Sequence, residues 1–221
     1  MDVVIAGGHG AVARHLGRML ADRGEHVRGL IRDEGQRGHL ERDGVEPVLL
    51  DLEAADADAY RGAIAGADAV VFAAGAGAGS GAARKETVDY GAAAKLLTAS
   101  RDAGVDRYVM ISSMGAGDPP PEREGDDVFA VYLRAKAKAD RELMASDRAW
   151  TVVRPGRLTD EPGGGHVALA AHVERGAIAR EDVAAVLAAV LDDDRTVGHV
   201  FEVVAGPTSI PAALDALVAG D

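Results

Sequence analysis

The sequence predicts an α/β domain built on a doubly wound parallel sheet. Short apolar, β-branched runs alternate along the chain with stretches whose apolar residues recur at helical spacing. Several of these runs are almost continuously apolar, as in parallel strands that are buried on both faces. A glycine cluster separates the first run from the first helical stretch. The 221 residues, of which 48% are hydrophobic, suffice for a core that needs no disulfide or metal.

The first βαβ unit is the most clearly defined part of this pattern. Residues 2–6 form a predicted strand, residues 11–23 an amphipathic helix and residues 26–32 a second strand. Gly24 is expected to end the helix, because glycine is favoured just after a helix C-terminus.

Further strands and helices continue the alternation. The predicted strands span residues 46–50, 68–74, 107–113, 149–154 and 199–204, and the predicted helices span residues 88–103, 128–144, 181–191 and a short stretch from 211. Residues 115–127 are rich in proline, glycine and acidic residues, which predicts a long loop of the kind that often forms a lid. We expect one domain over residues 1–221, with a core at 1–154 and a small C-terminal region at 155–221.

The charge and composition of the chain argue against several classes of function. Its 36 acidic and 24 basic residues give a net charge of −12, which disfavours a nucleic-acid partner. There is no cysteine, and the seven histidines form no metal-binding motif, so we expect no metal site. Apolar stretches fall short of the roughly 20 residues of a membrane span, and no signal-peptide pattern is present. We expect a cytoplasmic protein that has no membrane partner, and the sequence leaves a homodimer open.

The glycine turn fits a phosphate-binding site. The motif from Gly7 through Gly10 to Ala13 leaves backbone without Cβ atoms beside the start of the first helix. Amide groups and the helix dipole attract a pyrophosphate there. Among 28 glycines the motif could be an ordinary turn, but its position between strand and helix favours a dinucleotide.

The residue that ends the second strand indicates which dinucleotide binds. Sites for NAD usually carry an acid there for the ribose 2′-hydroxyl, whereas this chain has Arg32. An arginine attracts a 2′-phosphate, so NADP(H) is favoured over NAD(H). Asp33 could face the ribose instead, and Arg32 could simply be solvated.

A tyrosine and a lysine one helical turn apart form the candidate catalytic pair. Tyr132 and Lys136 share one face of a predicted helix. A nearby cation stabilises a phenolate, which lets a tyrosine exchange a proton with a carbonyl or alcohol while nicotinamide exchanges a hydride. Ser113, at the end of the fifth strand, could hold the same oxygen. The alternative is an ordinary pair on the surface of a helix.

The chain resembles an atypical short-chain dehydrogenase/reductase over nearly its whole length. The segments that carry the resemblance together are GGHGAVA, VRGLIRD, FAAGAG, VDYGAAAKLL, GVDRYVMISSMGA, YLRAKAKAD, TVVRPGRLTDEPG and IAREDVA. The resemblance is to the NAD(P)H-binding group related to NmrA-like proteins and biliverdin/flavin reductases, and it implies a Rossmann fold. It also implies catalytic roles for Ser113, Tyr132 and Lys136. The cofactor-binding residues that we expect are Gly7, Gly8, His9, Gly10, Ala11, Val12, Arg32, Asp51, Leu52, Ala73, Ala74, Gly75, Ser112, Lys136 and Pro155.

One residue departs from the pattern of better-characterised relatives. Better-characterised relatives carry an active-site asparagine at the position of Asp89. The resemblance implies that an aspartate is usual there in the atypical group. A carboxylate there could hold water in a proton relay, or it could mark a site that no longer runs the usual chemistry. Asp89 is therefore the fourth candidate catalytic residue.

Three functions remain open at this level. The leading hypothesis is an NADP(H)-dependent oxidoreductase that acts on a small organic substrate held by the C-terminal region. The second is a redox sensor that binds NADP(H) without turnover. The third is a nucleotide-sugar epimerase or dehydratase, which the short C-terminal region disfavours.

Overall fold

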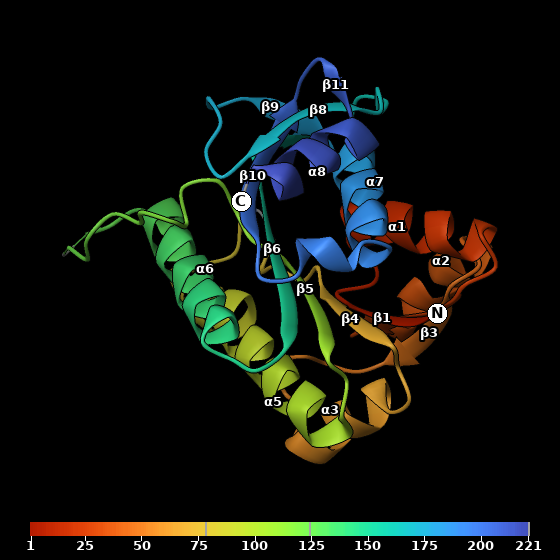
Figure 1. Ribbon diagram of the computed structural model, residues 1–221. Coiled ribbons are helices and arrows are strands. Elements are labelled where there is room, and N and C mark those ends of the chain that lie inside the picture. The colour runs from red at the N-terminus through yellow and green to blue at the C-terminus, as the bar shows by residue number, and fades with distance from the viewer. Residues whose placement is uncertain (78, 124, 221) are drawn as a thin grey trace.

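The computed structural model describes residues 1–77, 79–123 and 125–220. Over these residues the main sheet has nine strands, which are β1 (Asp2–Ala6), β2 (His26–Ile31), β3 (Glu46–Leu49), β4 (Ala69–Phe72), β5 (Arg107–Ile111), β6 (Ala149–Pro155), β8 (His166–Ala170), β10 (Val200–Ala205) and β11 (Thr208–Ser209). Their order is β11-β8-β10-β6-β5-β4-β1-β2-β3 (Figure 1). All neighbouring strands are parallel except at β8, which runs antiparallel to β10 and β11.

Helices cover both faces of the sheet. They are α1 (Ala11–Asp22), α2 (Arg37–Arg42), α3 (Ala57–Ile64), α4 (Ala82–Arg84), the π-helix η2 (Lys85–Ala92), α5 (Ala93–Ala103), α6 (Val128–Met144), α7 (Arg180–Leu191) and α8 (Ile210–Ala219), with 3₁₀ turns η1 (Glu34–Gln36) and η3 (Asp194–Thr196). In Figure 1, α1 and α7 lie on one side of the strands, and α3, α5 and α6 lie on the other.

Alternate residues of the same strand build two separate cores. Val3 and Ile5 of β1 pack into the cluster that contains Leu16 of α1. Val4 and Ala6 face the opposite way, into the cluster that contains Leu96 of α5. Each face of the sheet therefore buries an apolar layer, which confirms the predicted doubly wound α/β fold.

The structure differs from the prediction mainly at short elements. The predicted helix 88–103 begins earlier, at Lys85, and its first part winds as the π-helix η2. The edge strand β11 and its neighbour β8, and the separate parallel pair β7 (Arg157–Thr159) and β9 (Ala177–Ala179), were not predicted. Three of these strands, β7, β9 and β11, are two or three residues long, too short to show a clear period in sequence.

The sheet also fixes where a ligand can bind. The chain proceeds outward in opposite directions from β1, whose neighbours are β2 and β4. Loops that leave the carboxyl ends of these strands diverge there and open a crevice, which is the usual ligand site of this architecture.

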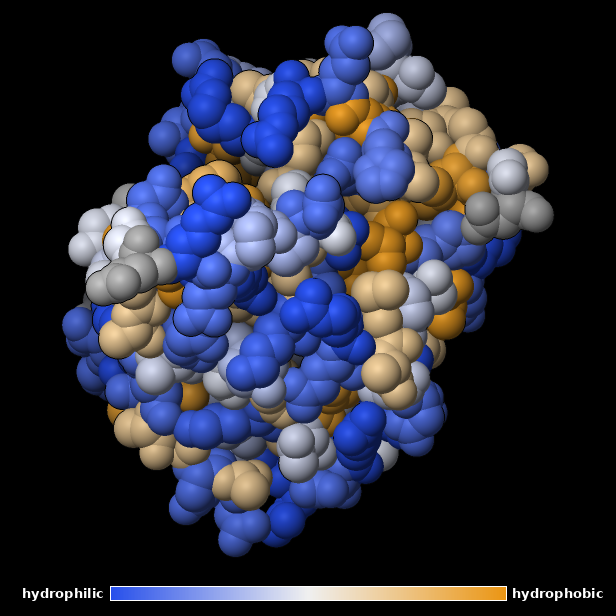
Figure 2. Space-filling model, turned by 90° about the vertical axis from the view of Figure 1, so that its left-hand side faces the viewer, coloured by the Kyte–Doolittle hydropathy of each residue, from blue (hydrophilic) through white to orange (hydrophobic). Residues whose placement is uncertain are grey.

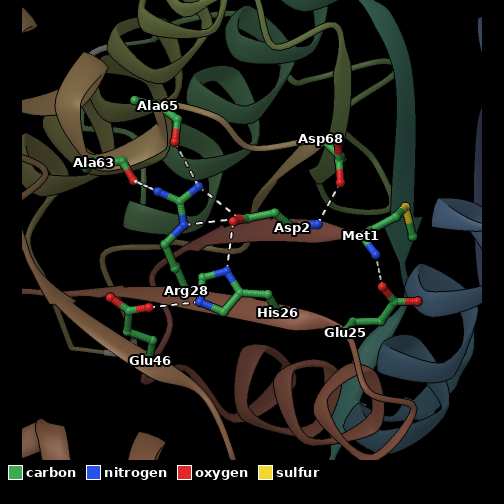
Figure 3. A network of polar contacts seen from close by, with 9 residues as sticks. All are labelled: Met1, Asp2, Glu25, His26, Arg28, Glu46, Ala63, Ala65 and Asp68. Carbon is green, nitrogen blue, oxygen red and sulfur yellow. Dashed lines mark hydrogen bonds and ion pairs between the residues drawn. The ribbon is translucent and has the colours of Figure 1, made fainter.

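A polar network joins the amino ends of β1 and β2, at the end of the strands opposite the crevice (Figure 3). Arg28 donates to Asp2 and to two backbone carbonyls before β4. His26 bridges Asp2 and Glu46, at 2.7 and 2.9 Å. Its hydrogen bond with Asp2, and then that with Glu46, raises the pKa of His26 above its ordinary value.

The acidic loop before α6 is fastened to that helix. Arg134 forms a 2.8 Å ion pair with Asp126 and donates to the carbonyl of Pro120 at 3.3 Å. Figure 1 shows this segment extending outward beside α6, and Figure 2 shows a largely hydrophilic face on that side of the molecule, with an apolar band at its upper right. A lid role for this loop stays a prediction.

Among the described helices, none is long and apolar enough to cross a membrane.

Candidate functional site

Close packing explains two of the three glycines in the first turn. Gly7 has φ +81°, and a Cβ there would lie 2.7 Å from the Cα of Ala74. A Cβ on Gly8 would lie 2.7 Å from the Cα of Gly29 in β2. Gly8, which we expected to contact the cofactor, therefore faces the neighbouring strand.

The third glycine opens the start of α1 to a ligand. Gly10 is the N-cap of α1, and no side chain caps the helix. The first backbone N–H groups of a helix have no partner within the helix, so those of α1 can donate to an anion. Such a cradle fits a pyrophosphate, because the N-terminal end of the helix dipole also favours negative charge.

Two cavities meet at this turn. We name them the arginine cavity, of about 330 Å³, and the tyrosine cavity, of about 550 Å³. Gly10, Ala73, Ala74, Gly75 and Gly77 line both of them. The cavities together form a trough that passes over the start of α1 and the end of β4.

The arginine cavity collects most of the residues predicted for the adenosine side. Its lining includes Gly7, His9, Leu30, Ile31, Arg32, Gln36, Leu50, Asp51, Leu52, Glu53 and Arg84. Arg32 is exposed and has no ion pair within 4.0 Å in the described part of the chain. Asp33, the alternative contact for the ribose, accepts a hydrogen bond from the amide of Gly35 at 2.8 Å and so caps η1.

A second arginine in this cavity is already neutralised. Arg84 pairs with Glu53, which also accepts a hydrogen bond from Thr87 at 2.7 Å. The hydrogen bond from Arg84, followed by that from Thr87, holds the pKa of Glu53 below its ordinary value. The Glu53 carboxylate thus stays charged but paired, which leaves Arg32 as the cation free to meet an anion among the described residues of this cavity.

The tyrosine cavity collects the predicted catalytic residues. Ser113, Tyr132, Lys136 and Asp89 all line it, together with the predicted cofactor contacts Ala11, Val12, Ser112 and Pro155. These residues come from η2, α1, α6 and the ends of β5 and β6, which the sheet brings to one edge. The hydroxyl of Ser113 donates to the carbonyl of Met114 at 3.3 Å.

Lys136 is held beneath this cavity. Its ammonium donates to the carbonyl of Ile111 at 3.0 Å and lies 3.7 Å from Asp89 Oδ1. The other oxygen of Asp89 accepts a hydrogen bond from the amide of Ala76 at 3.2 Å. Lys136 and Tyr132 line the same cavity, and a second cation, Lys85, lies over the Tyr132 ring, at 5.3 Å from its centroid.

Sequence reasoning did not single out Lys85. Arg84 and Lys85 are adjacent at the α4–η2 junction, yet Arg84 lines the arginine cavity and Lys85 the tyrosine cavity. The signal in the sequence was weak, since a basic pair near the start of a helix is usually solvated. Irregular π winding is frequent at functional sites, and here it carries both Lys85 and Asp89.

A buried network supports Ser112 from below. The Ser112 hydroxyl donates to Asp140 Oδ2 at 2.8 Å, and Arg154 binds the same oxygen at 2.9 Å. Burial raises the pKa of Asp140, and the charge of Arg154 and the Ser112 hydrogen bond oppose that shift. The Ser112 hydroxyl is therefore engaged by Asp140, which leaves Ser113 as the serine better able to contact a substrate.

Fold and site together define a dinucleotide-binding α/β protein with a tyrosine in its second cavity. Residues 7–194 match the family described as NAD(P)H-binding, and the chain belongs to that family. This confirms the NAD(P)H-binding group that the sequence resembles.

Individual relatives agree with this assignment. The chain is 36% identical over 218 residues, 98% of its length and 100% of the relative's, to a Bacillus subtilis (strain 168) protein named "Uncharacterized sugar epimerase YhfK". A solved structure described as a putative NAD-dependent epimerase/dehydratase from Bacillus halodurans matches with TM-score 0.90 and 36% identity, covering 98% of this chain and 100% of that one. The oxidoreductase ylbE from Lactococcus lactis matches with TM-score 0.86 and 25% identity, covering 99% and 97%.

Proposed function

We propose that the protein is an NADP(H)-dependent oxidoreductase that reduces a carbonyl group of a small organic molecule. The observation that carries this proposal is the trough of two adjoining cavities. Its arginine end suits a 2′-phosphate, its middle offers the amides of α1 to a pyrophosphate, and its tyrosine end places Tyr132 and Ser113 around one space.

The preference for NADP(H) rests on Arg32 and Asp33. The Arg32 guanidinium is exposed at the cavity and can form charge-assisted hydrogen bonds to a phosphate. The Asp33 carboxylate, which would favour a ribose hydroxyl, instead accepts the Gly35 amide. NAD(H) would find no equivalent benefit from Arg32.

The proposed chemistry divides between cofactor and protein. NADPH, when bound, supplies a hydride to the carbonyl carbon and leaves as NADP⁺. The Tyr132 hydroxyl gives its proton to the carbonyl oxygen as the C=O π bond breaks, so that an alcohol forms, and Tyr132 recovers a proton from solvent. The Ser113 hydroxyl would hold the carbonyl oxygen, and the Lys136–Asp89 pair would keep the floor of the site in place.

Epimerisation is the second candidate, because the names of the two Bacillus relatives include the word epimerase. An epimerase oxidises and re-reduces the same substrate, so it consumes no NADPH overall. The 25% identical oxidoreductase from Lactococcus lactis agrees with net reduction. A sensor without turnover is the third candidate, and all three functions share the same cofactor site.

NADPH oxidation tests the proposal directly. Purified protein is mixed with NADPH and a panel of aldehydes, quinones and flavins, and the loss of NADPH absorbance is followed. At least one acceptor is expected to be reduced, and Tyr132→Phe is expected to lower kcat by about 100-fold or more without weakening NADPH binding. Tyr90→Phe, a half-buried tyrosine beside Lys138, is the matched control. NADPH binding without turnover, or unchanged turnover in Tyr132→Phe, would overturn the proposal.

A further inference from the structure

The tyrosine cavity holds a buried lysine that has no carboxylate partner in the described chain. We propose that Lys85 binds the anionic group of the substrate, and that the substrate is a planar organic carboxylate about the size of a naphthalene. This inference rests on the proposed function, since it assigns the substrate class of the same site.

The charges around the cavity distinguish Lys85 from its neighbours. Three cations line the cavity: Lys85, Lys136 and Arg180. Lys136 lies 3.7 Å from Asp89, and Arg180 forms a 2.6 Å ion pair with Asp160. Across residues 1–77, 79–123 and 125–220, no carboxylate lies within 4.0 Å of the Lys85 ammonium.

Burial makes an ammonium without a counter-charge costly. Lys85 is only 8% exposed, and a charge taken out of water destabilises the fold unless it is paired or hydrogen-bonded. Its ammonium has three donors, and the bond to the Gly77 carbonyl at 3.0 Å uses one of them. The remaining donors are suited to a carboxylate, which accepts charge-assisted hydrogen bonds through two oxygens.

The rest of the lining favours a flat, apolar body on that anion. The rings of Phe129 and Tyr132 stack with centroids 5.8 Å apart and planes 29° apart. Phe129 is 56% exposed and its neighbour Val128 is 42% exposed, although both are large apolar residues at the cavity. Aromatic faces exposed at a cavity can stack against a planar ligand.

The size of the cavity sets the size of the occupant. Its volume of about 550 Å³ must also hold the nicotinamide end of the cofactor. The space that is left suits one or two fused rings with a carbonyl close to Tyr132 and an acid group at Lys85.

The test measures binding, so it needs no turnover. Isothermal titration calorimetry on NADP⁺-saturated protein compares 2-naphthoate with 2-naphthamide, which has the same rings but no charge. The wild-type protein is expected to bind 2-naphthoate tighter by about tenfold or more. Lys85→Gln, which keeps a donor for Gly77, is expected to abolish this preference, and Lys85→Arg to retain most of it. Lys138→Gln, on the exposed side of α6, is the control and should behave as wild type.

Three results would overturn the inference: equal affinity of wild type for the two probes, no binding of either probe, or a preference that survives in Lys85→Gln. Acetate, which carries the charge without the ring, is expected to bind at least about tenfold more weakly than 2-naphthoate. If acetate binds equally well, the planar part of the inference is wrong. Binding as expected without reduction of any acceptor would contradict the proposed function alone.

Discussion

Lys136 Nζ lies 3.7 Å from Asp89 Oδ1, and the two side chains are only 4% and 0% exposed. The same ammonium reaches the carbonyls of Ile111 and Ala74, at 3.0 and 3.5 Å. The pair therefore links α6 and η2 to the ends of β5 and β4 beneath the tyrosine cavity. Its geometry also accounts for an acid at position 89, because a carboxylate balances the charge of Lys136.

Removing one member of this pair should cost stability. Asp89→Asn retains an oxygen for the Ala76 amide but leaves Lys136 without a counter-charge, so we expect the free energy of unfolding to fall by about 3 kcal/mol. Urea denaturation measures this change. In the double variant with Lys136→Met, the Asp89 substitution should cost much less, and strictly additive costs would show that the pair is not coupled.

The contacts of Gly7 predict a second stability difference. Gly7 and Gly24 have nearly the same φ, +81° and +82°, but no atom outside the neighbouring residues lies within 4 Å of a Cβ at Gly24. Gly24→Ala should cost about 1 kcal/mol, from backbone strain alone. Gly7→Ala adds the overlap with Ala74 and should cost about 1–3 kcal/mol more. Equal midpoints of unfolding would mean that the turn can move away from Ala74.

The network of His26 predicts how stability depends on pH. Because Asp2 and then Glu46 raise the folded-state pKa of His26, protonated His26 stabilises the fold. This contribution is complete below the unfolded value of about 6.5 and is lost as pH rises through the folded pKa. The stability gap between wild type and His26→Gln should therefore shrink from about pH 6 to about pH 9 in urea denaturation.

A control separates this network from a general effect of removing histidine. His15 contacts Arg18 rather than a carboxylate. His15→Gln, measured by urea denaturation over the same pH range, supplies the control for the loss of an imidazole. A gap for His26→Gln that grows with pH would contradict the assigned sign.

The central strands could be predicted from sequence because they depend on local patterns. The apolar runs of β1, β4 and β5 are almost continuous, as in buried parallel strands, and Gly104 ends α5 in the left-handed conformation that favours glycine. Arg32 lines the arginine cavity and Tyr132 lines the tyrosine cavity, and their roles there stay predictions.

What could not be predicted depends on tertiary packing. The short strand β8 pairs with the edge of β10, and β11 pairs in turn with β8. Arg84 and Lys85 line different cavities, and no local pattern reveals which of two adjacent cations faces which cavity. Likewise, Ser112 and Ser113 are equivalent in sequence until Asp140 accepts the hydroxyl of Ser112.

Because the net charge is −12, we expect cofactor binding to depend on few local cations. Arg101 on α5 is a matched control, since it is an exposed arginine outside both cavities. Arg101→Ala is expected to leave both dissociation constants, for NADPH and for NADH, unchanged.

The most direct test of the account is the ratio of the dissociation constants for NADPH and NADH in wild type and in Arg32→Ala. Wild type is expected to prefer NADPH by about tenfold or more, and the variant is expected to lose that preference through weaker NADPH binding alone. Equal affinity of wild type for the two cofactors, or a preference for NADPH that persists without Arg32, would contradict the account.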